Sequence, residues 1–83
     1  MKIVKIYTKS YCPYCTAAKN LLNDLAVNYQ EIDITNTPEI IEELSSKSGF
    51  RTVPQIFVDE EVIGGYTDLA AMHERGEFLP KVK

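Results

Sequence analysis

The sequence predicts an α/β fold in which helices cover a single four-stranded mixed sheet, and three patterns support this prediction. Strand-like and helix-like stretches follow one another in the order β-α-β-α-β-β-α. The strand–helix–strand opening implies a right-handed crossover and therefore a parallel strand pair. The acidic turn at residues 59–61, between two apolar stretches, implies an antiparallel hairpin. A mixed sheet covered by helices accommodates both arrangements.

The predicted strands share β-branched and aromatic residues, which are enriched in β-sheets. They are expected at residues 3–7, 27–34, 53–58 and 62–63. The third strand carries Pro54 near its start, where a missing backbone donor is tolerated. The Gly64-Gly65 pair ends the fourth strand.

The predicted helices combine an apolar stripe with start and stop signals. They are expected at residues 12–25, 37–49 and 67–76. Pro13 and Pro38 suit a first helical turn, where the N–H that proline lacks has no partner within the helix. Gly49 is a typical C-cap residue, and Thr67-Asp68 is a typical cap at a helix start.

Length and composition place the chain among ordinary folded domains. It has 83 residues, of which 45% are apolar and 25% are charged. Surface scaling indicates that about 63% of the surface of the unfolded chain is buried on folding. That is enough for one core, so we expect a single domain spanning residues 1–83. The composition excludes a disordered or collagen-like chain.

Hydropathy and charge restrict the location and partners of the protein. No apolar run approaches the roughly 20 residues of a membrane span, and the N-terminus lacks the apolar core of a signal peptide. We therefore expect a cytoplasmic protein that does not bind membranes. A net charge of −3 argues against nucleic acid as the main partner. The charge is uneven, because residues 1–20 contain four lysines and no acid, whereas residues 24–61 contain nine acids and two basic residues.

Cys12 and Cys15 are the only cysteines, and their number and spacing favour a redox pair. A secreted mini-protein of this size normally has about four to eight cysteines, and a disulfide closing so short a loop would contribute only about 1.9 kcal/mol. A zinc site would need two further ligands, and only His73 offers another obvious nitrogen or sulfur donor, so we expect no metal site. The alternative is that both cysteines are small buried apolar residues.

The position of Cys12 at a helix start favours a stabilised thiolate. The first N–H groups of a helix lack internal acceptors and carry about half a positive charge, and Lys9 lies three residues upstream. The i, i+3 spacing places the sulfurs of Cys12 and Cys15 on one face, and Pro13 stiffens the turn between them. A stabilised thiolate gains most as a leaving group, because its lower intrinsic nucleophilicity offsets its larger population during attack.

Three separated motifs resemble those of the dithiol glutaredoxin family. They are Cys12-Pro13-Tyr14-Cys15 after a strand, Thr52-Val53-Pro54, and Gly64-Gly65-Tyr66-Thr67-Asp68. The resemblance extends from residue 3 to about residue 79, which is nearly the whole chain. It implies a thioredoxin-like fold with sheet order 2-1-3-4 and an antiparallel third strand. It also implies a glutathione-dependent thiol–disulfide oxidoreductase that takes glutathione as co-substrate and holds no bound cofactor.

The resemblance further implies a glutathione site beside the catalytic residues Cys12 and Cys15. The positions implied for glutathione binding are Lys9, Tyr14, Arg51, Thr52, Val53, Pro54, Gly65, Thr67 and Asp68. The bond before Pro54, cis in the family, would expose Val53 as a backbone edge on which an extended peptide can pair. The alternatives are that Lys9 and Arg51 are solvated surface charges and that Thr67 and Asp68 only cap a helix.

The implied roles follow the charges of glutathione, which has two carboxylates and one ammonium group. Lys9 and Arg51 would meet the glycine carboxylate. The helix start at Thr67 and Asp68 would bind the γ-glutamyl carboxylate, and the Asp68 side chain would bind the ammonium group. Tyr14 is expected to be exposed and to flank the tripeptide.

Other features of the resemblance leave alternatives open. Tyr11 is expected to pack within the fold, while Tyr66 and Ile41 stand where many relatives carry different residues. The implied partners are glutathionylated or disulfide-containing proteins, and a monomer is expected. Thioredoxin reductase could replace glutathione as the source of electrons. A dimeric iron–sulfur scaffold is a further alternative, which Pro13 disfavours because cluster-binding relatives usually have a smaller residue there.

Overall fold

The computed structural model describes residues 2–83 and contains a sheet whose four strands lie in the order β2-β1-β3-β4. The strands are β1 (Val4–Thr8), β2 (Gln30–Asp33), β3 (Gln55–Val58) and β4 (Glu61–Gly64). β1 pairs with β2 in parallel and with β3 antiparallel, and β3 pairs with β4 antiparallel. The predicted sheet order 2-1-3-4 and the antiparallel third strand are therefore confirmed.

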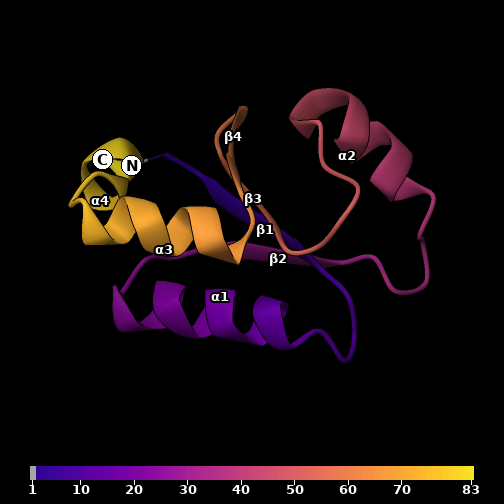
Figure 1. Ribbon diagram of the computed structural model, residues 1–83, viewed down its shortest axis with the longest axis horizontal. Coiled ribbons are helices and arrows are strands. Elements are labelled where there is room, and N and C mark those ends of the chain that lie inside the picture. The colour runs from indigo at the N-terminus through magenta and orange to yellow at the C-terminus, as the bar shows by residue number, and fades with distance from the viewer. Residues whose placement is uncertain (1) are drawn as a thin grey trace.

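Helices cover both faces of this sheet. They are α1 (Pro13–Asp24), α2 (Ile40–Ser48), α3 (Tyr66–Glu74) and α4 (Phe78–Val82). α1 and α3 contact each other, whereas α2 lies apart from them (Figure 1). The Lys2 N–H donates to the Val82 carbonyl at 2.8 Å, so the start of the described chain lies beside α4 (Figure 1). No helix within residues 2–83 is long and apolar enough to cross a membrane.

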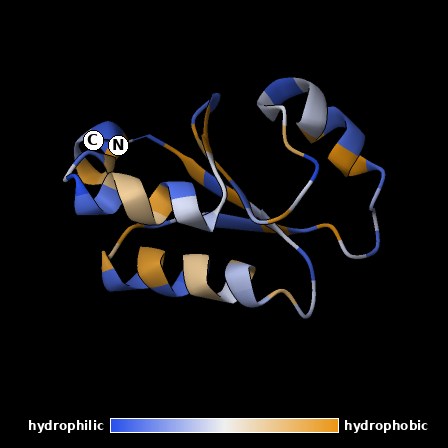
Figure 2. Cartoon of the chain, in the orientation of Figure 1, coloured by the Kyte–Doolittle hydropathy of each residue, from blue (hydrophilic) through white to orange (hydrophobic). Residues whose placement is uncertain are grey.

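The core lies between the sheet and the α1–α3 pair. Alternate residues of β1 are buried because successive strand side chains point to opposite faces. Val4 and Ile6 of β1 therefore join one buried cluster with Leu22 of α1 and Leu69 of α3. Hydrophobic and hydrophilic residues alternate along α1, as expected for a helix that buries one stripe (Figure 2).

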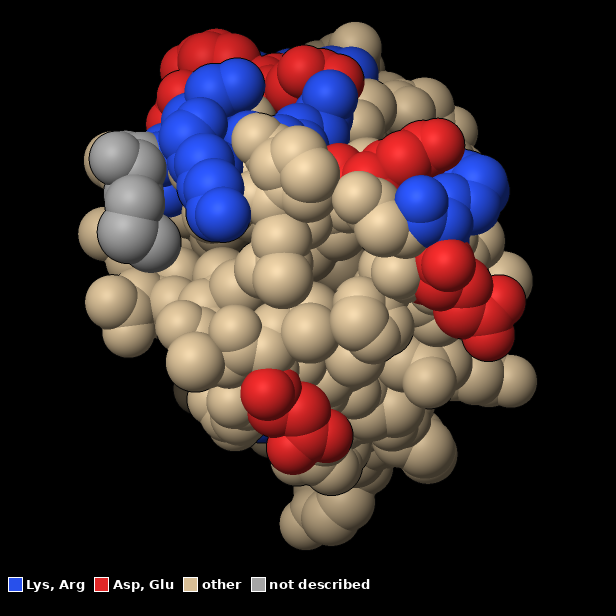
Figure 3. Space-filling view, turned by 90° about the vertical axis from the view of Figure 1, so that its left-hand side faces the viewer, with Lys and Arg blue, Asp and Glu red and all other residues tan. Residues whose placement is uncertain are grey.

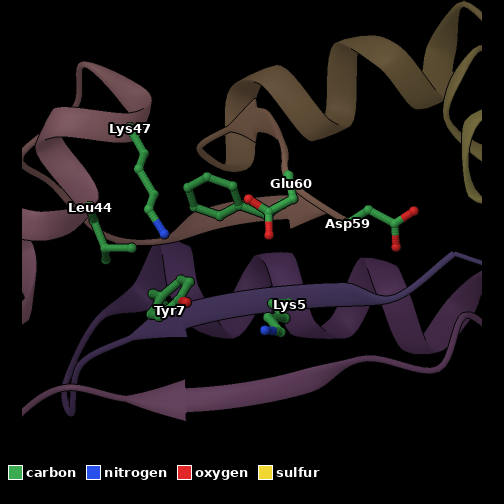
Figure 4. A pocket seen from close by; sticks show the side chains of 7 residues that line it. Lys5, Tyr7, Leu44, Lys47, Asp59 and Glu60 are labelled. Carbon is green, nitrogen blue, oxygen red and sulfur yellow. The ribbon is translucent and has the colours of Figure 1, made fainter.

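The opposite face of the sheet lies under α2. Tyr7 of β1 packs edge-on against Phe57 of β3, with ring centroids 5.8 Å apart. Leu44 and Lys47 extend from α2 toward Tyr7, and Lys5, further along β1, lines the same pocket (Figure 4). The pocket that these side chains line has a volume of about 50 Å³ and includes neither cysteine.

Basic and acidic side chains both occur on the end of the molecule that carries the two described termini. Basic and acidic side chains lie side by side along one rim of this end, above a largely uncharged area (Figure 3). Residues 62–83 contain three basic and three acidic residues, so the C-terminal section adds no net charge. The positive excess therefore belongs to residues 1–20, which include both cysteines.

The predicted second strand is too long at its N-terminal end. It was expected at residues 27–34, whereas β2 is Gln30–Asp33. Val27 instead closes the end of α1, because its N–H donates to the Leu22 carbonyl at 3.0 Å and Ala26 before it has a φ of 56°. An apolar residue that packs beneath a helix end has the same local pattern as the start of a strand.

The predicted second helix begins with a tighter turn than expected. The Ile40 N–H donates to the Thr37 carbonyl, three residues back, so regular α-helical structure starts only at Ile40. Gly49, with a φ of 81°, ends α2 as predicted. The remaining predicted elements agree with the observed bounds to within two residues.

α4 is absent from the predicted elements. It spans only five residues and contains Pro80, which indicates a helix end rather than a helix. The proline is tolerated because it lies in the first turn, where its missing N–H has no partner within the helix. Phe78 and Val82, four residues apart, are both buried in the core cluster and hold α4 against it.

Candidate active site

The turn between β1 and α1 presents Cys12 at the start of the helix. Tyr11 has a φ of 59° and a fully exposed side chain, so the prediction that it packs within the fold is wrong. A left-handed backbone at this position reverses the chain direction and turns the ring outward. Cys12 is the N-cap of α1 and Pro13 its first residue. The Cys15 N–H donates to the Cys12 Sγ at 3.2 Å, which is the thiol version of an N-cap hydrogen bond.

The two cysteines have different environments. Cys12 is partly exposed, whereas only 2% of Cys15 is exposed, and both are free thiols. Burial raises the pKa of Cys15 to about 12, and its hydrogen bond with Cys12 acts in the same direction. Cys12 is therefore the sulfur that a substrate can reach, and Cys15 is a protonated thiol behind it at neutral pH.

The loop before β3 lies against Cys12 and begins a second set of site residues. The Val53–Pro54 bond is cis, as the resemblance implies, and Pro54 is buried. The Cys12 Sγ lies 3.9 Å from the Val53 carbonyl oxygen. Gln55, which follows, is buried and holds this loop to the end of α2, because its side-chain N–H donates to the Phe50 carbonyl at 3.0 Å.

A groove of about 170 Å³ continues from this loop to the start of α3. The residues that line it are Tyr14, Thr52, Val53, Pro54, Gly65, Tyr66, Thr67 and Asp68. The rings of Tyr14 and Tyr66 form one wall, with centroids 6.2 Å apart. Tyr14 is 64% exposed, which confirms its expected exposure. The N-terminal ends of α1 and α3 thus both point away from the end that carries the described termini, toward the loop before β3 (Figure 1).

The turn between β4 and α3 requires glycine. Gly64 has a φ of 121°, and a Cβ there would collide with the Asp68 carboxylate. That carboxylate accepts the Gly65 N–H at 3.0 Å and so closes the first turn of α3. The backbone at the helix start is therefore held next to the groove.

Seven of the nine predicted glutathione positions line this groove, and the other two do not. Lys9 lines a neighbouring pocket that also includes Cys12. Arg51 lines neither, because its guanidinium pairs with the Glu42 carboxylate on α2. The hydrogen-bonded Glu42 carboxylate raises the pKa of Arg51, and the Arg51 guanidinium lowers the pKa of Glu42. The glutathione-binding role of all nine residues stays a prediction.

The neighbouring pocket, with a volume of about 460 Å³, brings two further residues to the cysteines. Besides Cys12 and Cys15 it includes Lys19 and Glu31, which were not predicted as part of the site. The Lys19 ammonium and the Glu31 carboxylate form an ion pair of 3.0 Å. Lys19 follows Cys15 by four residues on α1, so helical spacing could have identified it. Glu31 could not be found this way, because its proximity depends on β2 pairing with β1.

The described residues form no evident metal site. Across residues 2–83, no three His, Cys, Asp or Glu side chains form a group that could hold a metal ion. His73 is exposed near the end of α3, far along the chain from the cysteines.

Comparison with known proteins identifies the family. The family model described as glutaredoxin matches residues 4–63. The chain is 47% identical over 83 residues to glutaredoxin 3 of Escherichia coli K12, covering 100% of both chains, and 43% identical to glutaredoxin-1 of Bos taurus, covering 96% of this chain and 81% of the bovine protein.

Solved structures give the same result. A buckwheat glutaredoxin–glutathione complex superposes with a TM-score of 0.91 at 30% identity, covering 98% of this chain and 76% of the buckwheat chain. The solution structure of a Brucella melitensis glutaredoxin has a TM-score of 0.88 at 41% identity, covering 100% and 90% of the two chains. With its accessible N-cap cysteine, its buried second cysteine and its thioredoxin-like sheet, the chain belongs to the glutaredoxin family of thiol–disulfide oxidoreductases.

Proposed function

We propose that this protein uses glutathione to reduce protein–glutathione mixed disulfides and protein disulfides through Cys12 and Cys15. The observation that carries the proposal is the difference between the two sulfurs. Cys12 is accessible and accepts an N–H at a helix start, and Cys15 is a buried thiol one turn further along. One sulfur can therefore exchange with a substrate while the other is protected from it.

Glutathione is proposed to lie in the groove between Tyr14 and the start of α3. One relative, the buckwheat glutaredoxin, is described as a complex with glutathione. The backbone of Val53, a half-buried residue that lines the groove, suits pairing with the cysteinyl unit of the tripeptide. The N–H groups of Thr67 and Asp68 at the start of a nine-residue helix suit its γ-glutamyl carboxylate. Lys9, on the far side of Cys12, supplies positive charge for the glycine carboxylate.

Deglutathionylation needs only Cys12 in this mechanism. The Cys12 thiolate attacks the glutathione sulfur of the mixed disulfide, forms a Cys12–glutathione disulfide and releases the protein thiolate. The thiolate of a second glutathione then attacks the glutathione sulfur of that adduct. This step regenerates the Cys12 thiolate and yields oxidised glutathione. The hydrogen bond from the Cys15 N–H to the Cys12 Sγ stabilises the leaving sulfur.

Reduction of a protein disulfide requires both cysteines. Cys12 attacks one sulfur of the client disulfide, and the first client thiolate leaves. Cys15 then attacks the Cys12 sulfur, forms the Cys12–Cys15 disulfide and releases the second client thiolate. Two molecules of glutathione reduce the new disulfide and become oxidised glutathione.

The test is turnover of a small glutathionylated peptide in the presence of glutathione and glutathione reductase. Oxidation of the reduced nicotinamide cofactor of the reductase measures the rate. Mass spectrometry of the acid-quenched reaction should detect one glutathione on Cys12. Absence of both turnover and adduct would contradict the proposal. Turnover that requires thioredoxin reductase in place of glutathione would contradict the choice of reductant alone.

The wider setting of the protein is proposed on sequence grounds. We take its partners to be glutathionylated or disulfide-containing proteins, its location to be the cytoplasm and its working form to be a monomer, with no cofactor bound. Each follows from the composition and from the family resemblance.

A further inference from the structure

The dithiol route requires Cys15 to lose a proton in a buried position. Burial is the main cause that raises the pKa of Cys15, and it persists when Cys12 is bound to a client, so little Cys15 thiolate is present at neutral pH. Cys12 cannot help at this stage, because its sulfur is already bound to the client. The pocket beside Cys15 therefore has to supply whatever stabilises the thiolate.

The charged groups facing that pocket come from three segments. Lys9 precedes α1, Lys19 lies on α1, and Glu31 and Asp33 lie on β2. Lys19 is one helical turn beyond Cys15 and therefore on the same face of α1. The hydrogen bond with Glu31 is the main cause that raises the pKa of Lys19, and attraction to Cys15 adds a smaller effect in the same direction. Lys19 in turn lowers the pKa of Cys15, against the larger effect of burial.

The Lys19 ammonium is held in place by its partner. Its Nζ lies 3.0 Å from the Glu31 Oε2, and the Thr8 hydroxyl donates to the same oxygen at 2.8 Å. Thr8 is buried, and the side chain of Lys19 is only 29% exposed. Asp33 is engaged elsewhere, because it accepts the Thr35 N–H at 2.8 Å. A partly buried, anchored cation interacts more strongly with a nearby thiolate than a freely solvated one does.

We propose that Lys19, anchored by Glu31 and Thr8, is a positioning residue for the second half of the dithiol reaction, in which its ammonium stabilises the Cys15 thiolate as it forms. This inference rests on the proposed function of Cys12 and Cys15. The Cys15 proton passes to water in the pocket, and the thiolate attacks the Cys12 sulfur. The bond from Cys12 to the client breaks, and the departing client thiolate takes a proton from solvent. No further oxidant is needed, because the client disulfide accepts both electrons.

The experiment separates the two steps with oxidised glutathione as the client. Reduced protein is mixed with excess oxidised glutathione, quenched with acid and analysed by mass spectrometry. The first step, formation of the Cys12–glutathione adduct, depends on the concentration of oxidised glutathione. The second step, attack by Cys15, converts the adduct to the Cys12–Cys15 disulfide with a first-order rate constant that does not depend on it.

Lys19→Gln is expected to lower the second rate constant by about tenfold at pH 7 and to move its half-maximal pH upward, because one stabilising charge is lost. Lys19→Arg, which keeps the charge, should stay within about threefold of the wild type. The matched control is Lys47→Gln, which breaks an exposed pair with Glu43 on α2 and should change neither step.

The outcomes distinguish the two proposals. If the wild type forms no adduct, the proposed function fails. The role of Lys19 is refuted if the adduct forms at the normal rate in every variant and the second rate constant of Lys19→Gln equals that of the wild type at all pH values. An equal loss in Lys47→Gln, or in the first step of Lys19→Gln, would also refute it, since either would indicate a non-specific charge or folding effect.

Discussion

The chemistry of the site depends on a difference in burial between two residues of the same type. Cys12 is the N-cap and Cys15 the third residue of α1, so one turn of helix separates an accessible sulfur from a buried one. The same N–H that belongs to Cys15 also stabilises the Cys12 sulfur. Replacing either residue should therefore affect different steps.

Cys12→Ser is expected to abolish both deglutathionylation and protein disulfide reduction, because no other accessible sulfur lies in the described site. Cys15→Ser should retain deglutathionylation within about threefold and should lose disulfide reduction by at least about a hundredfold. Parallel assays with a glutathionylated peptide and a disulfide-containing protein measure the two routes. An equal loss in both assays for Cys15→Ser would contradict this division of roles.

Cys15 also links stability to pH. Its pKa rises from an ordinary value of 9.0 to about 12 on folding, so the folded state favours the protonated thiol. The resulting stability is fully present below pH 9 and is lost as the pH rises toward 12. A Cys12→Ser background removes the contribution of the Cys12 thiol to this rise and keeps the larger contribution of burial. In that background, the free-energy advantage of Cys15 over Cys15→Ala should fall by about 1–2 kcal/mol between pH 8 and pH 10.5.

Urea unfolding of the two variants at both pH values measures this difference. The pairing cancels the titration of tyrosines and lysines, which both variants share. A pH-independent difference would mean that Cys15 ionises as easily in the folded as in the unfolded chain.

At the scale of elements, the sequence predicts what repeats locally and misses what depends on tertiary contacts. Apolar periodicity and the positions of Pro13 and Pro54 predict β1, α1 and β3. The predicted groove positions come from three motifs, at the start of α1, in the loop before β3 and at the start of α3. α4 was missed because five residues with an internal proline carry no periodic signal, although packing fixes them. Glu31 was missed because only strand pairing brings it to Lys19.

α4 is expected to be important for stability despite its length. Phe78 is completely buried in the core cluster, so Phe78→Ala should lower the free energy of unfolding by about 3–4 kcal/mol. Leu79, the next residue, is 38% exposed and is the matched control, with an expected loss below about 1 kcal/mol for Leu79→Ala. Urea denaturation of both variants compares them. Similar losses would mean that α4 is held by its helical backbone rather than by the buried ring.

At the scale of the whole molecule, the fold brings three distant segments to one end of the sheet. The turn after β1 carries Cys12, the loop before β3 lies against it, and the turn after β4 lines the groove that starts at this loop, although the three segments span more than fifty residues of sequence. α2 covers the opposite face of the sheet, over a pocket that includes neither cysteine (Figure 4). Whether a charged residue can affect the site therefore depends on where it lies in the fold, and not on whether it belongs to one of the sequence motifs.

Lys9 and Arg51 provide a test of this distinction, because both were predicted to meet the glycine carboxylate of glutathione. Lys9 lines a pocket with Cys12, whereas the exposed Arg51 guanidinium is paired with Glu42 on α2. Lys9→Gln should therefore raise the KM for glutathione by about two- to fivefold, the effect of one solvent-screened charge contact, and Arg51→Gln should change it by less than about twofold. Steady-state kinetics with a glutathionylated peptide at low ionic strength measure both values. If Arg51→Gln raised the KM as much as Lys9→Gln, the guanidinium would have to leave Glu42 when glutathione binds, and the loop before β3 would then be a moving part of the site.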